Sequence, residues 1–252
     1  MHSGWLSGIL LWLTMSLPAM ALQAEQPELE WCLDDYPNRH NYPAQGSPYG
    51  PTVDFMQELA KRASIRIRYS PSIPFARCLR LMEQGKTDLM VRLKTDAERE
   101  RFMFMLPLQE SPPEILVIHT DSPDIKNTSE LKRLNVMFIR GYTYQGNTIN
   151  IIANHPRSII IDSIDVGLQM LLKGRGDAIV TTEEYINRQI QSKSEYRDQF
   201  KLASLPLHDA EQNFFIYLAL SKASPHAHLK ERLEQAIASM IADDLMDLYG
   251  DN

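Results

Sequence analysis

The first 24 residues of the 252-residue chain lack Lys, Arg, Asp and Glu altogether. They contain an apolar run over residues 9–17, interrupted by two hydroxyl residues, which is shorter than the ~20 residues that a membrane span needs. Small residues follow, with Ala21 and Ala24 as two candidate cleavage positions. The pattern predicts a secretory signal peptide over residues 1–24 and an exported mature chain. An uncleaved N-terminal anchor is the alternative.

The chain also lacks a second long apolar run, a nucleotide-binding loop, and the hydrolase patterns G-x-S-x-G and H-E-x-x-H. We therefore predict no enzymatic activity, and any ATPase would be a separate chain. The formal net charge of −6 belongs entirely to the 228 residues after the leader (252 − 24), because the leader has no charged side chain. This balance argues against general binding to nucleic acid or to anionic membranes.

Cysteine is scarce, with only Cys32 and Cys78 in the whole sequence. In an oxidising compartment an even count favours a disulfide between them, with two buried free thiols as the alternative. Their spacing does not resemble a zinc site. We therefore predict one disulfide and neither a metal nor a cofactor.

Apolar periodicity in the first third of the chain predicts alternating strands and helices. The predicted strands cover residues 28–33, 65–69 and 87–93, and the helices between them cover residues 53–62 and 75–82. This order implies parallel strand pairing with helices on the faces of the sheet. Ligands bind at the carboxyl ends of such strands, which makes segments 34–40 and 92–99 candidate ligand-binding loops.

The rest of the chain continues with shorter elements after a break at residues 111–114. Strands are predicted at residues 115–119, 135–139, 158–161, 177–181 and 214–220. Helices are predicted at residues 130–132, capped by Ser129, at residues 163–173, capped by Ser163, and at residues 183–191. An amphipathic helix over residues 229–245, with a break near Asp243, is expected to pack on the core.

Five short motifs follow one another in order: GPTVD at residues 50–54, LMEQGKTD at 81–88, TDAER at 95–99, GRGDAI at 174–179 and FIYLALSK at 215–222. In this series the chain resembles the bacterial extracellular solute-binding proteins of family 3, which include the polar amino-acid-binding proteins of ABC transporters. The resemblance implies a two-lobed α/β fold, the type II periplasmic binding fold. Each lobe would hold a mixed or mostly parallel sheet flanked by helices, and two hinge strands would join the lobes.

The resemblance also implies how the chain divides. The first lobe would comprise residues 25–110 and 218–252, and the second lobe residues 114–209. The hinge would lie near residues 111–113 and 210–217. A solute would bind between the lobes of a monomer, and closure about the hinge would trap it.

Four ligand-binding positions transfer from the family to this sequence. Arg99 matches the arginine that holds the α-carboxylate of the ligand, and its planar fork suits a bidentate contact. Phe75 matches an aromatic position that stacks on the ligand. Thr143 matches a second-lobe position that meets the carboxylate, and Tyr36 matches an aromatic residue of the first loop. The alternatives are a solvated surface charge for Arg99 and a core position for Phe75.

Three further positions depart from the family pattern. Arg92 and Lys94 stand where small hydroxyl or glycine residues are usual, and they alternate on a strand end, which can point both side chains to the same side. In members of the family an acidic residue usually meets the α-ammonium group of the ligand. The matching position in this sequence is Thr182, with Glu183 beside it. Because a buried ammonium group without an acidic partner is costly, the ammonium site is an open question. The cleft is expected to be rich in positive charge.

The leading functional prediction is a periplasmic protein that captures a small carboxylate-bearing solute, amino-acid-like or anionic, for an ABC-type transporter. Its partners would be the solute and a membrane permease or sensor kinase, without nucleic acid. One alternative is an orphan periplasmic sensor. The other is an enzyme of the lyase or dehydratase type on the same fold, with Asp35, His40 or Glu183 as acid and base. For Asp35 and His40, ordinary turn residues are the simpler interpretation.

Overall fold

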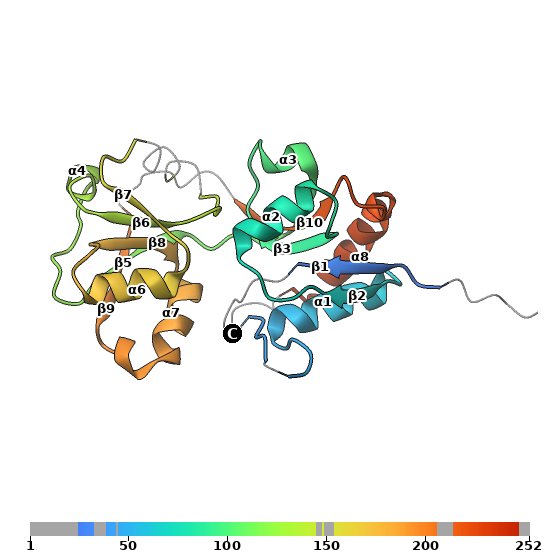
Figure 1. Cartoon of the computed structure of the whole chain (residues 1–252), viewed down its shortest axis with the longest axis horizontal. Coiled ribbons are helices and arrows are strands. Elements are labelled where there is room, and N and C mark those ends of the chain that lie inside the picture. Colours follow the sequence, from blue (N-terminus) through green and yellow to red (C-terminus); the bar gives the residue numbers. More distant parts are fainter. Residues whose placement is uncertain are drawn as a thin grey trace, which may run out of the picture.

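The structure is a computed structural model that describes residues 25–32, 39–43, 45–144, 148, 154–205 and 214–246. The predicted leader and Tyr36 lie outside the described residues. Figure 1 shows two α/β lobes side by side, each built on its own sheet. No helix in the described part is long and apolar enough to cross a membrane.

The first lobe holds a five-stranded sheet in the order β2-β1-β3-β10-β4. Its strands are β1 (Glu28–Trp31), β2 (Arg66–Tyr69), β3 (Leu89–Leu93), β4 (Met103–Glu110) and β10 (Phe215–Ser221), and its helices are α1 (Pro51–Arg62), α2 (Phe75–Glu83), α3 (Arg99–Phe102), η2 (Ala227–Leu229) and α8 (Lys230–Ala242). Strand β1 pairs in parallel with β2 and β3, as the strand–helix–strand order predicts. Strand β10 is antiparallel to β3 and β4, which makes the sheet mixed.

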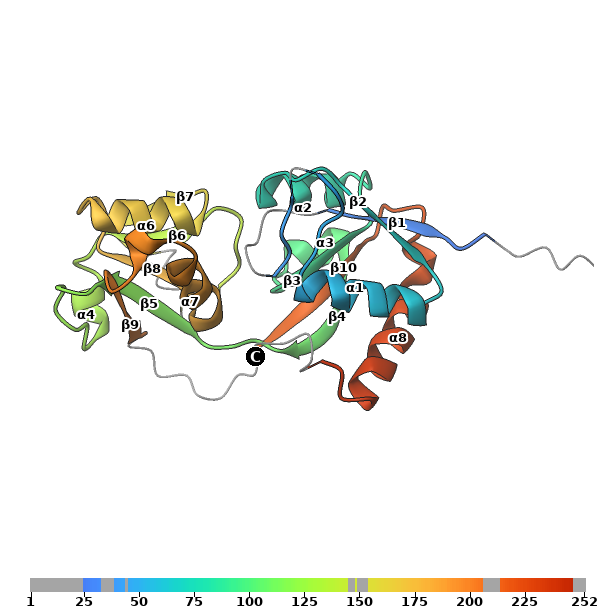
Figure 2. The same cartoon turned by 90° about the horizontal axis from the view of Figure 1, so that it is seen from below.

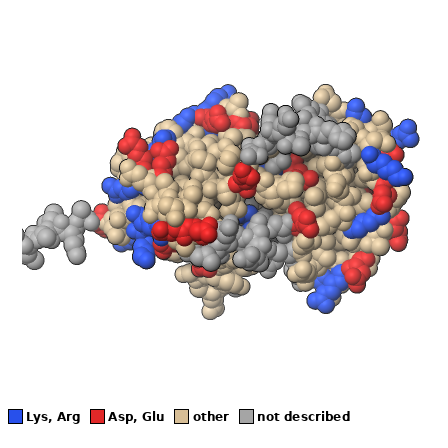
Figure 3. All heavy atoms as spheres, turned by 180° about the vertical axis from the view of Figure 1, so that it is seen from behind, with Lys and Arg blue, Asp and Glu red and all other residues tan. Residues whose placement is uncertain are grey.

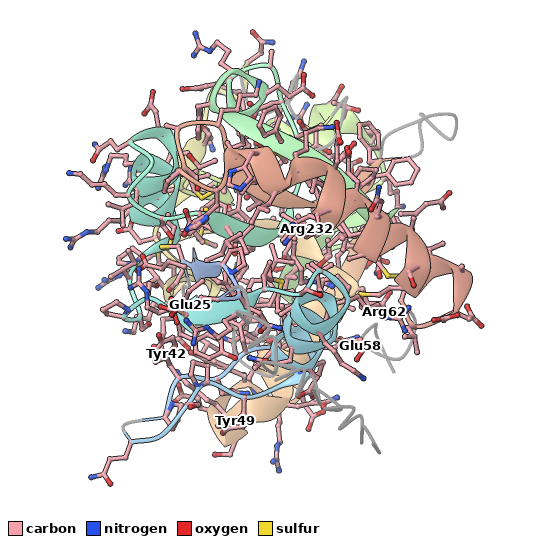
Figure 4. The ribbon with its side chains drawn as sticks, turned by 90° about the vertical axis from the view of Figure 1, so that its right-hand side faces the viewer. Glu25, Tyr42, Tyr49, Glu58, Arg62 and Arg232 are labelled. Atoms are coloured by element: carbon pink, nitrogen blue, oxygen red, sulfur yellow. A yellow bond between two sulfur atoms is a disulfide. The ribbon has the colours of Figure 1, made fainter. Side chains whose placement is uncertain are left out.

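Helix α1 has apolar residues along one face and a proline in its first turn, where no backbone N–H is needed. Met56 and Leu59 on that face are fully buried in a core that residues of α8 share. Arg62 forms ion pairs with Glu58, at 2.7 Å, and with Asp243 just after α8, at 2.6 Å. Figure 4 shows Glu58 and Arg62 along this part of the first lobe. Core packing and the ion pair between Arg62 and Asp243 hold α8 against α1.

The second lobe holds another five-stranded sheet, in the order β7-β6-β8-β5-β9. Its strands are β5 (Glu114–His119), β6 (Val136–Ile139), β7 (Ser158–Ile161), β8 (Ala178–Thr182) and β9 (Phe200–Ser204), and its helices are α4 (Thr128–Leu131), α6 (Ile164–Leu172), α7 (Glu183–Ser192) and η1 (Ser194–Tyr196). Strand β6 is parallel to β7 and β8, whereas β5 is antiparallel to β8 and β9. Figure 2 shows β4 of the first lobe leading into β5 of the second.

The two-lobed α/β fold predicted from the sequence is confirmed, with local corrections. Ser163 caps α6 as expected, because its hydroxyl oxygen accepts a hydrogen bond from the amide of Val166. The expected cap of α4 is wrong. Asn127 rather than Ser129 caps this helix, since the Asn127 side chain accepts a hydrogen bond from the Glu130 amide.

Cys32 and Cys78 form a disulfide, with their Cα atoms 5.7 Å apart. Cys32 follows β1 and Cys78 lies on α2, so the bond joins the sheet to the helix that begins at Phe75. Both sulfur-bearing side chains are buried. The disulfide therefore fixes the start of α2 relative to the first sheet.

Candidate ligand-binding site

A cavity of about 120 Å³ lies between the two lobes. Its walls come from the carboxyl-terminal ends of β3 and β8, the turn after β6, the start of α2 and the connection between β4 and β5. Because one water molecule needs roughly 10–15 Å³ of such space, the cavity has room for on the order of ten of them. This size suits a solute with the dimensions of an amino acid.

Six of the seven predicted ligand-binding residues line this one cavity: Phe75, Arg92, Lys94, Arg99, Thr143 and Thr182. The seventh, Tyr36, lies outside the described residues. Glu183 is exposed and does not line the cavity. Residues far apart in the sequence, from both lobes, thus meet around one space.

Arg99 lies at the start of α3 and is only 5% exposed. Its guanidinium donates hydrogen bonds to the backbone carbonyl oxygens of Lys94 and, at 2.6 Å, of Gly141 in the second lobe. Its Nε atom lies 3.8 Å from a carboxylate oxygen of Asp96. Burial lowers the pKa of Arg99, and the charge of Asp96 opposes this shift. An arginine remains protonated at neutral pH, so the cleft contains a buried cation held from both lobes.

A second contact crosses the cleft beside Arg99. The hydroxyl group of Thr143 donates a hydrogen bond to the Asp96 carboxylate, which also accepts one from the Arg99 amide at 2.8 Å. Burial by itself would raise the pKa of Asp96, but these hydrogen bonds and the charge of Arg99 lower it below its ordinary value of 3.8. Asp96 is therefore ionised at neutral pH and links the two lobes.

One aromatic ring, that of Phe75, lies against the guanidinium of Arg99. The Phe75 ring centroid lies 5.6 Å from the guanidinium carbon, and the Tyr142 ring meets Phe75 edge-on with centroids 5.0 Å apart. Gly141 precedes Tyr142 with a φ of +79°, which glycine adopts without steric cost, and a Cβ atom there would lie 3.4 Å from Phe75. The turn of the second lobe thus packs directly on the aromatic residue of the first.

The hinge side of the cavity carries an ion pair. Lys94 Nζ lies 2.5 Å from Glu114 Oε1, and these two side chains are 17% and 3% exposed. Glu114 begins β5 and lies directly opposite Thr182 of β8 in the antiparallel register. Sequence analysis misses Glu114, because a pairing between distant segments places it in the cavity. The one local signal is its position at the end of the predicted break at residues 111–114.

Two more lining residues are buried. His40 lines the cavity, although an ordinary turn is the simpler interpretation of its sequence context, and its ring lies edge-on to Trp31 with centroids 5.5 Å apart. The hydroxyl oxygen of Tyr144 accepts a hydrogen bond from the Ile139 amide at 2.8 Å. Burial raises the pKa of Tyr144, which makes it a neutral part of the cavity wall.

The outer surface differs from the cavity in its charge pattern. On the face in Figure 3, Lys and Arg side chains are interspersed with Asp and Glu over both lobes. Of the described residues that line the cavity, Arg92, Lys94 and Arg99 are cationic and Glu114 alone carries a carboxylate. Among the described residues, no three His, Cys, Asp or Glu side chains form a group that could hold a metal ion. The gathered cations suit an anionic group of a ligand.

Solved structures of other proteins share this fold. An ancestral arginine-binding protein bound to glutamine has a TM-score of 0.72 and 19% identity over 90% of this chain and 97% of that chain. The arginine-, lysine-, histidine-binding protein ArtJ from Geobacillus stearothermophilus has a TM-score of 0.72 and 15% identity over 89% and 93%. A histidine kinase sensor domain with similarity to periplasmic binding proteins has a TM-score of 0.73 and 14% identity over 89% and 94%. At these identities the likeness shows the fold alone.

None of the curated proteins compared with the chain matches it. The model of one protein family matches residues 31–250, which is nearly the whole sequence after the predicted leader. The two lobes and the cavity between them agree with that match. The chain belongs to the bacterial extracellular solute-binding proteins, family 3.

Proposed function

We propose that the protein is a periplasmic receptor that captures a small carboxylate-bearing solute between its lobes and delivers it to an ABC-type transporter. Family membership supports solute binding outside the cytoplasm, and amino-acid-binding proteins share the fold. Hinge motion at residues 111–113 and 210–217 would open the cavity and close it again.

The environment of Arg99 carries this proposal. A guanidinium has five N–H donors, and two carbonyl oxygens occupy only part of that set. The remaining donors can form a charge-assisted pair with a carboxylate, and such pairs are strong in a cavity that excludes water. Phe75 lies against the guanidinium and offers a flat surface to the rest of the solute.

The charge of the cavity argues against a cationic solute such as arginine. Arginine-binding proteins share the fold, yet three of the described side chains that line the cavity here are cationic. The positively charged side chain of such a solute would be repelled at short range by Arg92 or Lys94. We therefore place the solute among anionic or zwitterionic carboxylates.

Glu114 supplies an acidic side chain close to Thr182, the position at which members of the family usually have the acid that meets the ammonium group of the ligand. Directly opposed residues of an antiparallel pair have Cβ atoms about 4.5–5.5 Å apart. The Glu114 carboxylate can therefore meet an ammonium group that an acid at position 182 would otherwise meet. One of its oxygens already contacts Lys94, and a carboxylate accepts several hydrogen bonds. An amino acid thus fits the cavity as well as a simple carboxylate does.

A sensor is the second candidate function. The histidine kinase sensor domain that shares this fold supports it, because the same closure can signal to a membrane protein instead of releasing a solute to a permease. Both functions require the same carboxylate site.

A thermal-shift screen of residues 25–252 against amino acids, dicarboxylates, sugar acids and small peptides tests the proposal. A solute that binds only the folded state raises the melting temperature by mass action. We expect a carboxylate to do so, with the shift lost in Arg99→Ala and kept in Arg101→Ala, whose side chain is 75% exposed. No shift with any carboxylate would contradict the receptor, and a shift kept in Arg99→Ala would contradict the anchor.

A further inference from the structure

The turn after β6 contacts the first lobe at three consecutive residues, Gly141, Tyr142 and Thr143. The first two meet residues of the cavity wall. Thr143 instead donates its hydrogen bond to Asp96, which is not among the described residues that line the cavity. Each contact joins atoms of the protein to one another, so it favours closure of the lobes whichever solute is bound.

The hydroxyl group of Thr143 is committed to Asp96. A threonine hydroxyl has one hydrogen to donate, and Thr143 donates it to Oδ2 of Asp96. The Asp96 carboxylate, which is ionised at neutral pH, and the carboxylate of a solute can both only accept hydrogen bonds. The Thr143 hydroxyl would therefore have to release Asp96 before it could donate to the solute. Its position suits closure of the lobes better than contact with a solute carboxylate.

Asp96 connects this closure contact to Arg99, the proposed anchor of the solute. Its Oδ1 atom accepts a hydrogen bond from the Arg99 amide at 2.8 Å, and its Oδ2 atom lies 3.8 Å from Nε of the same arginine. That Oδ2 atom is also the acceptor of the hydrogen bond from Thr143. When the second lobe closes, Thr143 thus binds the carboxylate that lies against both the backbone and the guanidinium of Arg99.

We propose that Asp96 and Thr143 form a closure latch, in which Thr143 binds Asp96 rather than the solute and Asp96 acts as a positioning residue for Arg99. This inference rests on the proposed function, in which Arg99 holds a carboxylate of the solute. The latch stabilises the closed state by the same amount with every solute, because none of its atoms belongs to the solute. It therefore raises affinity without selecting among solutes.

Calorimetric titration of residues 25–252 tests the latch with the two carboxylates that give the largest shifts in the thermal-shift screen. Thr143→Val removes the hydroxyl group and keeps the branched shape of the side chain. Asp96 is 33% exposed, so we expect the loss of one hydrogen bond to weaken binding by about fivefold. The factor should be the same for both solutes. A loss that differs severalfold between them would show that Thr143 contacts the solute and would overturn the latch.

A double-mutant cycle with Asp96→Ala tests the partnership directly. In the Asp96→Ala background, Thr143→Val should have no further effect, because its partner is already absent. Asp96→Ala itself should weaken binding more than Thr143→Val does, because Arg99 also loses a partner. Asp96→Asn keeps an oxygen that can accept one hydrogen bond, so it should restore part of the affinity. A loss from Thr143→Val that persists at full size in the Asp96→Ala background would overturn the latch.

Thr95 provides a matched control. Its hydroxyl group also donates a hydrogen bond to a carboxylate, that of Glu100 at 2.8 Å, but both residues belong to the first lobe. We expect Thr95→Val to bind both solutes as the wild type does. Equal losses in Thr95→Val and Thr143→Val would show that the loss does not come from a bond between the lobes.

Small-angle X-ray scattering of the free protein measures closure without a solute. If the free wild type is mostly closed, loss of the latch opens it and increases the radius of gyration. If the free wild type is mostly open, the loss is seen as weaker binding instead, because less of the protein is competent to bind. Thr143→Val should therefore expand the free protein or weaken binding. A variant that does neither would overturn the latch.

The outcomes separate the two proposals. If carboxylates bind but Thr143→Val fails these tests, the latch is wrong and the carboxylate receptor stands. If no carboxylate raises the melting temperature, the receptor is wrong and scattering alone decides on the latch. In that case a larger radius of gyration in Thr143→Val would support the latch, and an unchanged one would overturn it.

Discussion

The two lobes contribute different kinds of groups to the cavity. In the described part of the chain, the cationic side chains that line the cavity all come from the first lobe: Arg92, Lys94 and Arg99. The second lobe contributes the Glu114 carboxylate, hydroxyl groups and the Gly141 carbonyl oxygen. The first lobe is also the one that the disulfide cross-links. This difference supports the proposal that the cross-linked, cationic first lobe holds the solute and that the second lobe completes the site on closure.

The disulfide offers the largest expected effect. Cross-linking residues 46 apart contributes about 4 kcal/mol to stability in the chain-entropy account, and the second lobe has no such bond because the protein has only two cysteines. In the Cys32→Ala/Cys78→Ala variant, the first lobe should unfold at a lower urea concentration than the second.

Fluorescence and circular dichroism can separate the two lobes. Trp31 is the only tryptophan after residue 24, and it is buried in the first lobe, so its fluorescence reports that lobe. Circular dichroism follows both lobes. Coincident transitions at the wild-type midpoint would contradict a stabilising role for the disulfide.

Removal of Arg99 is expected to have the next largest effect. Loss of one member of a buried charge pair typically costs about 3 kcal/mol, which corresponds to roughly 100-fold weaker binding. Thr143→Ala, on the second lobe, should weaken binding by less, because it removes a neutral donor. Calorimetric titration with the best carboxylate measures both. A larger loss of affinity in Thr143→Ala than in Arg99→Ala would mean that the second lobe, and not the first, contributes the stronger contact with the solute.

Alanine substitutions at two glycines of the second lobe are expected to have smaller effects on binding, and the two variants serve as controls for each other. Gly141 and Gly174 both have positive φ, at +79° and +61°, so alanine should destabilise either site by about 1–2 kcal/mol. Only Gly141 accepts a hydrogen bond from Arg99, and relaxation of its backbone would turn that carbonyl away. We expect Gly141→Ala to bind about tenfold more weakly and Gly174→Ala to bind normally. Equal affinities in the two variants would show that this contact does not support binding.

The contact between Asp96 and Thr143 predicts the smallest effect, a dependence on pH. The pKa of Asp96 is lowered in the folded protein, so its contribution is fully present above its ordinary value of 3.8 and is lost as the pH falls through the lower folded value. The melting temperature of the ligand-free protein should therefore fall less steeply below pH 4 in Asp96→Asn than in the wild type. Identical pH profiles would show that Asp96 does not contribute.

Local patterns in the sequence predict the strand–helix–strand order and the residues at the strand ends. They fail where distant segments decide the structure. Strand β4 contains Pro107, which argues against a strand, but β4 is an edge strand and there proline is tolerated. The bulge at Arg92 depends on its pairing with β10, and the placement of Glu114 on the pairing of β5 with β8. No local periodicity encodes these registers.

Calorimetric titration of wild type, Arg99→Ala and Arg101→Ala with the tightest carboxylate from the screen tests the central claim most directly. The two arginines are neighbours on α3, but one is buried in the cleft and the other is exposed. We predict wild-type affinity for Arg101→Ala and affinity on the order of 100-fold weaker for Arg99→Ala. Equal affinities in the two variants would contradict a carboxylate receptor anchored by the first lobe.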